Sequence, residues 1–286
     1  MGHKLLARGR WLWLALGAVL FLFVFLSVLI HTLPGDAVLS FVRPVLARGG
    51  FGISSQSFRT EFPFAFRMEN AAVTRQGGGT LRLDLVQAAW EWTGLLRWLP
   101  FHVTVAKGDA KAEVHISPRF WNPGKGRLTL ERLASADLTP LVPFPVSGAG
   151  FLLDSAEAQW RRSASGGVAG TGKGRFAWMR VPIPEPTSPI REALLEDVTI
   201  LFAFRDRSLI VSSITGTFEG ARVRGNGEIA EIFTPSRSTV TFHLTVENPL
   251  EGKIAGIFDL LAKNAKNANL RITGTLLSPA GQFQFF

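Results

Sequence analysis

Residues 11–30 form an uninterrupted run of apolar and small residues without a single charged side chain. A helix of about 20 such residues can cross the hydrocarbon core of a bilayer, because each residue adds about 1.5 Å of rise. Aromatic residues at its start would lie in the interfacial belt of a membrane. We therefore expect a transmembrane anchor over residues 11–33. The aromatic residues assigned to this anchor are Trp11, Trp13, Phe21, Phe23 and Phe25.

The charges on either side of this run predict its orientation. Lys4, Arg8 and Arg10 precede it, whereas the first charge to follow is Asp36. By the positive-inside rule, residues 1–10 stay in the cytoplasm and the rest of the chain, 34–286, is exported. A cleaved signal peptide is the alternative. It needs a shorter apolar core and a small-x-small cleavage site, which the residues after the run do not supply.

The chain is basic, with 31 Lys and Arg against 22 Asp and Glu, and it contains no Cys. Disulfides and thiolate–metal sites are therefore excluded. A basic balance can indicate nucleic acid, but export argues against that partner. Anionic lipid head groups or an acidic protein fit better, and a merely solvated basic surface is the alternative.

From residue 51 onward, apolar residues recur at every second position. Such alternation predicts strands with one apolar and one wet face, as in antiparallel sheets. We therefore expect a mainly β domain built on a curved, mainly antiparallel sheet. The apolar members of the clearest alternating runs are Leu81, Leu83 and Leu85; Ala112, Val114 and Ile116; Leu128 and Leu130; and Val240, Phe242, Leu244 and Val246.

Two short amphipathic helices are predicted beside the sheet. The first covers 34–48, where Pro44 predicts a kink or an early end. The second begins at Asn248-Pro249, a cap followed by a proline at the first helical position, and continues over 250–266. One or two helical turns are expected at 94–99.

Glycine, proline and polar clusters predict the breaks between strands. Residues 181–189 (VPIPEPTSP) contain four prolines and predict an extended connection. A sub-boundary at 181–190 is one interpretation, and a crossing loop inside one continuous sheet is the favoured one. The predicted turns lie at 77–79, 107–109, 122–124, 206–207 and 225–227.

No catalytic, cofactor or metal site is predicted, so we do not expect an enzyme. Residues 167–173 match G-x-x-x-x-G-K, but Gly174 stands where a phosphate loop needs Ser or Thr. We interpret this segment as a flexible Gly-rich turn. His102, His115 and His243 lie on separate predicted strands without metal-ligand spacing, and we expect them at the surface.

A large sheet with one apolar face must bury that face. The favoured interpretation is that the sheet closes over its own core, as a sandwich or collapsed half-barrel. The alternative is a groove that holds an apolar ligand such as phospholipid acyl chains. The candidate lining residues are Phe62, Phe64, Phe66, Leu81, Leu83, Phe202, Phe204, Phe242, Leu244, Phe283 and Phe285.

The order of these features resembles known bacterial proteins. A basic N-terminus, an apolar helix, a short amphipathic helix, the segment 62–73 (FPFAFRMENAAV) and strands with Gly turns are similar to AsmA-like proteins. In the C-terminal part, the segment 225–229 (GNGEI), a Thr-rich strand, Asn248-Pro249 and the ending 270–279 (LRITGTLLSP) resemble the type II secretion system protein N (GspN) family.

This resemblance covers most of the chain in element order and implies a function. It implies an accessory, single-pass component of the bacterial inner membrane, with its β-rich domain in the periplasm. The partners would be other subunits of the type II protein secretion system, and the family offers no catalytic residues to transfer. The AsmA-like resemblance implies the alternative, a lipid-binding or lipid-transfer half-barrel groove between inner and outer membranes.

Overall fold

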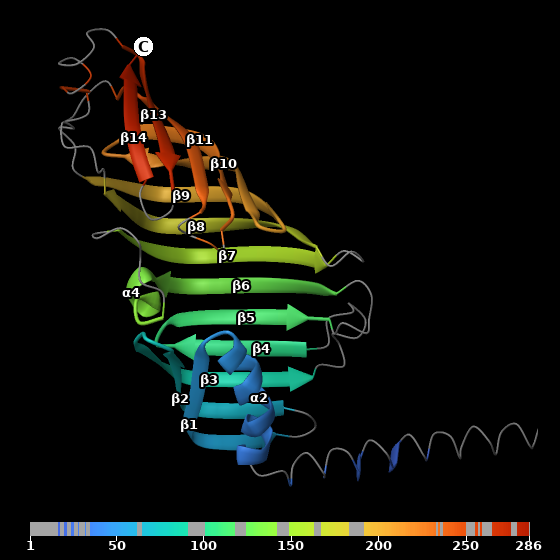
Figure 1. The fold of residues 1–286 in the computed structure, drawn as a ribbon. Coiled ribbons are helices and arrows are strands. Elements are labelled where there is room, and N and C mark those ends of the chain that lie inside the picture. The colour runs from blue at the N-terminus through green and yellow to red at the C-terminus, as the bar shows by residue number, and fades with distance from the viewer. Residues whose placement is uncertain are drawn as a thin grey trace, which may run out of the picture.

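A single antiparallel sheet of 14 strands makes up most of the described structure (Figure 1). The strands lie in the sheet in their order along the chain, and each pairs antiparallel with the next. The computed structural model describes residues 17, 20, 21, 24, 25, 28, 32, 35–61, 65–90, 101–117, 124–141, 149–162, 167–182, 192–232, 234, 237–249, 255, 256, 258, 265–275 and 279–285.

The strands of the first half of the sheet are connected mostly by short segments. Their bounds are β1 (Phe51–Glu61), β2 (Ala65–Arg75), β3 (Thr80–Trp90), β4 (Phe101–Lys107), β5 (Ala110–Ile116), β6 (Lys125–Ala134) and β7 (Gly150–Arg162).

The second half contains the longest strands and twists away from the first half, so that β10 to β14 run steeply across the direction of β4 to β7 in Figure 1. Its strands are β8 (Val168–Pro182), β9 (Glu192–Arg205), β10 (Ser208–Phe218), β11 (Ala221–Ala230), β12 (Thr239–Glu247), β13 (Asn267–Gly274) and β14 (Pro279–Phe285).

Helices also accompany the sheet. Helix α2 (Gly35–Arg48) packs against β1, and the short helix α4 (Ser135–Leu138) lies beside β6 and β7. Apart from these, the larger contacts between elements join neighbouring strands of the sheet. In the part of the chain that the structure describes, the sheet therefore has no second sheet packed on it.

Two-residue turns join several of the strands. Gly108, Asp206 and Gly220 each adopt a positive φ in such a turn. Tight hairpins need this backbone conformation, because it matches the twist of the two strands they connect, and Gly and Asp adopt it most readily. The turns at 77–79, 107–109 and 206–207 are thus confirmed, with Gly77 also at positive φ.

Some strands bend at a residue with positive φ inside the ladder. Asn70, Arg132 and Asp197 have φ values of 50°, 50° and 49°. The cross-strand register skips each of them. On either side of Asn70, the inward-facing positions change from even to odd numbers, so that Met68 and Ala71 face the same way. The bends therefore keep apolar residues on one face while the sheet curves.

One predicted alternation is corrected by such a bend. Leu81 and Leu83 are buried together, as expected. Leu85 instead pairs with Glu69 and Ala106, and the apolar series continues with Val86. The prediction that Leu85 shares the face of Leu81 was wrong because the strand changes face beside Asp84.

Two Gly-rich segments predicted as turns are strand interiors. Residues 225–227 lie within β11, and the segment 167–174 forms most of the first half of β8. Gly225 pairs with Leu244 and Gly227 with Phe242. Glycine here leaves room for a large side chain of the neighbouring strand. Because β8 continues as strand to Pro182, the strand–loop–helix of a phosphate loop is not formed.

The Pro-rich segment starts as strand. Val181 and Pro182 pair with Ala193 and Glu192, and residues 183–191 lie outside the described residues. The prediction that regular structure stops before Val181 was wrong. Proline lacks the backbone N–H that a strand donates to its neighbour, but the end of a strand tolerates this loss. One sheet continues across this connection.

The predicted helices can be placed in part. Helix α2 starts one residue after Pro34 and continues through Pro44 to Arg48, so it does not end early. Ala255, Gly256 and Phe258 are helical, whereas the rest of 250–264 and the turn at 94–99 lie outside the described residues.

The predicted membrane anchor lies mostly outside the described residues. The positions that are described between 11 and 33 are helical and exposed, with Leu20 62% and Phe21 72% accessible. Among the described residues, no helix has the length and apolar character needed to cross a membrane. The anchor, with Trp11, Trp13 and Phe23, stays a prediction.

Candidate functional site: the apolar face of the sheet

One row of apolar side chains and glycines runs across all 14 strands at right angles to them. Directly opposed residues of neighbouring strands share a face, so the register alone defines this row. At about 4.8 Å per strand, it spans about 60 Å. The row consists of Phe58, Met68, Val86, Val105, Ala112, Leu130, Ala156, Gly174, Ile200, Ile214, Gly225, Leu244, Leu270 and Phe283.

A second row lies two residues further along each strand. It begins with Phe66 on β2 and reaches β14 without a polar member. Its residues are Phe66, Ala88, Val103, Val114, Leu128, Ala158, Gly172, Phe202, Val211, Gly227, Phe242, Ile272 and Gly281.

A third row extends from β3 to β13 and is the most aromatic of the three. Its members are Trp90, Phe101, Ile116, Gly126, Trp160, Gly170, Phe204, Leu209, Ile229, Val240 and Gly274. We call the three rows together the apolar face.

Glycines in the apolar face lie beneath large side chains of the neighbouring strand. A Cβ atom at Gly172 would lie 2.4 Å from the Phe202 ring, and one at Gly227 would lie 2.3 Å from the Phe242 ring. Real Cβ atoms do not approach other atoms so closely. The aromatic rings therefore lie flat over backbone that only glycine leaves free, which makes this part of the face shallow and continuous.

Parts of the apolar face are only half-buried, whereas Val211 and Val240 in its second and third rows are each 5% exposed. Phe101 and Ile116, on neighbouring strands, are each 37% exposed, although the ring of Phe101 packs edge-on against Trp90 at 4.6 Å between ring centroids. Phe66, Phe202 and Phe242 are also partly exposed. Full burial would require a second layer, which the described elements do not provide.

Other buried apolar residues gather in two clusters at the margins of the face. One contains Ala71, Leu81 and Leu83, with Leu141 packed against it from the segment after α4. That segment is held by Gly79, whose N–H donates to the Pro140 carbonyl at 3.0 Å. Met68 and Val86 of the first row pack on this cluster, so the core and the apolar face are continuous.

The other cluster lies near the C-terminal end of the sheet. Phe258, which is 2% exposed, packs with Phe218, Val223 and Ala268. Leu244 of the first row packs against it. Leu141 and Phe258, which lie outside the strands, thus help to bury the margins of the apolar face.

The opposite face is polar and carries ion pairs between strands. Arg127 on β6 contacts Glu157 on β7 at 2.7 Å, and Lys111 contacts Glu113 within β5. Leu201 and Ile210 are apolar exceptions on this face, at 41% and 44% exposure. Alternate residues of the same strands therefore make one charged and one apolar surface.

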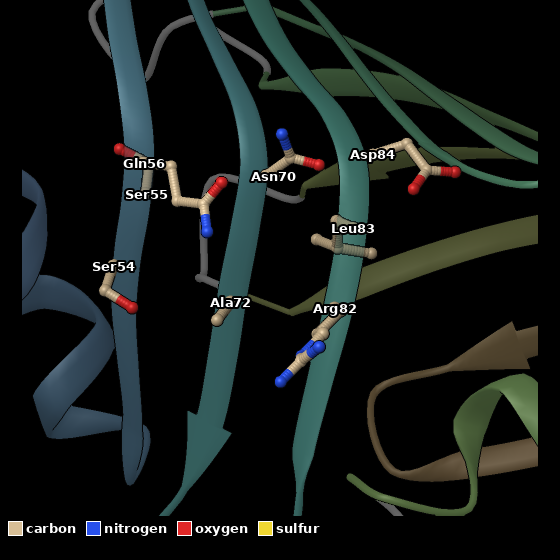
Figure 2. A pocket seen from close by; sticks show the side chains of 8 residues that line it. All are labelled: Ser54, Ser55, Gln56, Asn70, Ala72, Arg82, Leu83 and Asp84. Atoms are coloured by element: carbon tan, nitrogen blue, oxygen red, sulfur yellow. The ribbon is translucent and has the colours of Figure 1, made fainter.

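A shallow pocket of about 450 Å³ lies on β1 to β3, where these strands bend (Figure 2). Figure 2 shows Gln56, Asn70 and Asp84 side by side across the three strands. Arg82 lies two residues before Asp84 on β3. Asp84 Oδ2 accepts a hydrogen bond from the Gly108 N–H at 2.6 Å. The pocket is polar and small, and Asp84 is already used to hold the β4–β5 turn.

The structure brings most of the predicted lining residues to one surface. Phe66, Phe202, Phe204, Phe242 and Leu244 lie in the apolar face, whereas Leu81 and Leu83 belong to the buried cluster beside it. Phe62 and Phe64 lie outside the described residues. Phe283 pairs with Leu270 and Phe285 with Ala268, and only their backbone positions are described.

Sequence reasoning missed one cluster of polar side chains. His102 on β4 and His115 on β5 are directly opposed, and their rings stack 4.3 Å apart. Both are half-buried, not fully exposed as expected, while His243 is exposed. Glu113 lies beside them, and its hydrogen bond from Lys111 lowers the pKa of its carboxyl group. Only the pairing of β4 with β5 could have revealed this cluster.

The described residues thus define a class of protein: a single-layer antiparallel meander with one apolar face, which is buried at two margins and partly exposed elsewhere. The chain matches no protein-family model, no curated protein and no solved structure. The class therefore rests on the geometry of this chain alone.

Proposed function

We propose that the protein binds lipid acyl chains on the apolar face and holds them beside the bacterial inner membrane. The observation that supports this proposal is the unbroken apolar row across all 14 strands, together with the partial exposure of other residues of the apolar face, such as Phe101 and Ile116. A single soluble domain rarely leaves so long an apolar surface uncovered unless something apolar binds there.

The shape of the surface favours an acyl chain over a compact ligand. The rows carry no polar or charged side chain that could orient a small polar molecule. Pockets for such molecules usually place a few polar groups within an apolar lining. A flexible hydrocarbon chain needs only continuous apolar contact, which the flat rings of Phe202 and Phe242 extend over β8 and β11.

The predicted anchor fits this function. A helix over 11–33 in the inner membrane would hold the sheet in the periplasm next to a source of phospholipid. The polar face, with Arg127 and Lys111, would remain in water. This arrangement corresponds to the alternative that the AsmA-like resemblance implies, and the lipid would be a phospholipid of the membrane.

Site-specific photo-crosslinking in cells tests this proposal. A benzoylphenylalanine at Phe202 should form an adduct with phosphate-labelled phospholipid, because residue 202 lies in the apolar face. The matched control is Leu201, an exposed apolar residue on the polar face, where no adduct should form. Equal labelling at both positions, or none at 202 in a folded protein, would contradict lipid binding on this face.

A second candidate function is an accessory subunit of the type II secretion system. The observation that favours it is the free edge of the sheet: β14 is paired with β13 and, among the described strands, with no other. Unpaired strand edges can add a strand from a partner protein. The periplasmic partners would then be other secretion subunits.

Deleting the coding sequence and measuring secretion separates the two functions. A secretion subunit predicts that type II-dependent enzymes accumulate in the periplasm while the outer membrane stays intact. Cross-linking from Gln282, which is exposed on β14, should also capture a secretion subunit. Normal secretion with altered membrane lipid composition would leave only the lipid function.

A further inference from the structure

The polar face carries a side-chain cluster that neither the apolar face nor the predicted anchor uses. Glu113 and His115 are two residues apart on β5 and therefore point to the same side of the sheet. His102 on β4 is directly opposite His115, and Thr104 is directly opposite Glu113. Four polar side chains from two strands thus meet at one place.

The distances within this cluster are close to those of a metal site. One nitrogen of each histidine and one carboxylate oxygen of Glu113 all lie within 4.8 Å of one another. The two imidazole rings are parallel, with an interplanar angle of 4°. Donor atoms on a tetrahedral zinc ion are about 3.3 Å apart, given Zn–N distances of about 2.0–2.1 Å. An imidazole binds an ion through a lone pair in its ring plane, so at least one of the two stacked rings must turn for both nitrogens to reach the same ion.

The donor set selects the kind of ion. Two imidazole nitrogens and one carboxylate suit a divalent transition metal, whereas Mg²⁺ and Ca²⁺ prefer oxygen ligands alone. We propose that His102, Glu113 and His115 bind one divalent transition-metal ion of the Zn²⁺ type, with a fourth position open to water. The site lies on the face opposite the apolar rows, so it does not depend on the proposed lipid binding.

Neighbouring groups would tune the affinity of this site. Thr104 Oγ1 lies 3.1 Å from Nε2 of His102 and orients that ring. The Lys111 ammonium contacts a Glu113 carboxylate oxygen and must share the carboxylate with the metal. Arg127 is opposite His115, but its guanidinium group pairs with Glu157 on the next strand. Lys111 is therefore the main competitor of the ion.

A bound ion would tie β4 to β5. These strands flank a two-residue turn and are among the shortest of the sheet. Crosslinking them from the polar side would stiffen the region where Phe101 and Ile116 are most exposed on the apolar side. The expected consequence is a metal-dependent rise in melting temperature of the full chain.

Metal titration of the full-length protein in detergent tests the proposal. All variants are made in a background protein that carries His3→Ala and His31→Ala, and this background retains three histidines. Zn²⁺, measured by competition with a chromogenic chelator, should bind with a stoichiometry of one. The variants H102A, H115A and E113Q should each weaken binding at least tenfold. K111A should strengthen it.

His243→Ala is the matched control, because His243 is an exposed strand histidine on the same face but far from the cluster in sequence and register. The His243→Ala variant should bind Zn²⁺ with the same affinity as the background. E113Q keeps the shape of the side chain, so circular dichroism of this variant separates metal loss from unfolding. Absent binding in the background, or equal affinity in E113Q and the background, would overturn the proposal.

Discussion

The two faces of the sheet are made by alternate residues of the same strands, yet they differ in how their side chains interact. On the apolar face, Val103 and Val114 belong to a row that continues through every neighbouring strand. On the polar face, Thr104 and Glu113 interact with individual partners, Thr104 with His102 and Glu113 with Lys111. The backbone is common to both, so the difference arises from side chains alone.

This difference indicates two kinds of binding. The apolar face can bind collectively, because its rows are continuous over many strands and no single residue defines a pocket. The polar face is suited to local binding, since its charges are paired in small groups such as Arg127 with Glu157. Substitutions should therefore act through packing on one face and through individual partners on the other.

Phe242→Asp should give the largest effect. Phe242 lies over Gly227 and beside Ile272, so a carboxylate there would lose apolar contacts and remain without a partner. We expect the free energy of unfolding to fall by about 3 kcal/mol, measured by urea denaturation, and Leu244→Asp to act similarly. The control His243→Asp, on the polar face, should change it by less than about 0.5 kcal/mol. Equal effects at 242 and 243 would break the assignment of the two faces.

Gly172→Val should give the next largest effect. The added side chain would overlap the Phe202 ring, whose nearest atom lies 2.4 Å from the Cβ position. Overpacking of this kind costs about 1–3 kcal/mol, which a thermal melt of the full chain would detect. Thr171→Val, one residue away on the polar face, should be nearly neutral. Wild-type stability of Gly172→Val would show that the aromatic rings do not lie over this strand.

Lys111→Ala should have a smaller effect that depends on pH. The hydrogen bond from Lys111 lowers the pKa of Glu113, and Glu113 raises the pKa of Lys111. The stabilisation is therefore present above the unfolded-state pKa of Glu113 and is lost as the pH falls through its lower folded-state pKa. Melting temperatures of the variant and the wild type should differ slightly at pH 7 and converge in acid, once the pH lies below the lowered pKa of Glu113. A difference that persists in acid would exclude this ion pair as its cause.

Lys173→Ala should have the smallest effect. Lys173 is exposed on the polar face between Gly172 and Gly174, where the Gly-rich segment is a strand and not a nucleotide loop. Its removal should leave the free energy of unfolding within about 0.5 kcal/mol of wild type. Loss of a nucleotide-dependent activity in this variant would contradict the assignment.

The sequence predicts much of this fold because alternation and turn chemistry are local. The run from Val240 to Val246 is a strand as expected, and so are the runs around Val114 and Leu128. Strands that contain glycine cannot be predicted in this way, since glycine has no side chain and so contributes nothing to the alternation. Gly170 and Gly225 were assigned to turns because their role depends on Phe204 and Leu244, which lie far away in sequence.

The candidate sites also differ in how far the sequence could predict them. Aromatic residues with strand periodicity, such as Phe202 and Phe242, could be assigned to an apolar lining in advance. The alternation could not show whether a second layer covers them. The histidine cluster depends wholly on register, because a shift of β4 against β5 by one residue would place His102 and His115 on opposite sides.

The neighbour-to-neighbour order of the strands has a consequence for how such a molecule can change over evolution. Because every strand pairs only with those adjacent in the chain, contacts are local and folding can proceed hairpin by hairpin. Duplicating a hairpin such as β4–β5 would lengthen all three rows by two strands without rerouting any connection. The reach of the apolar surface is thus set by how many hairpins the gene encodes, as the length of a solenoid is set by its repeats.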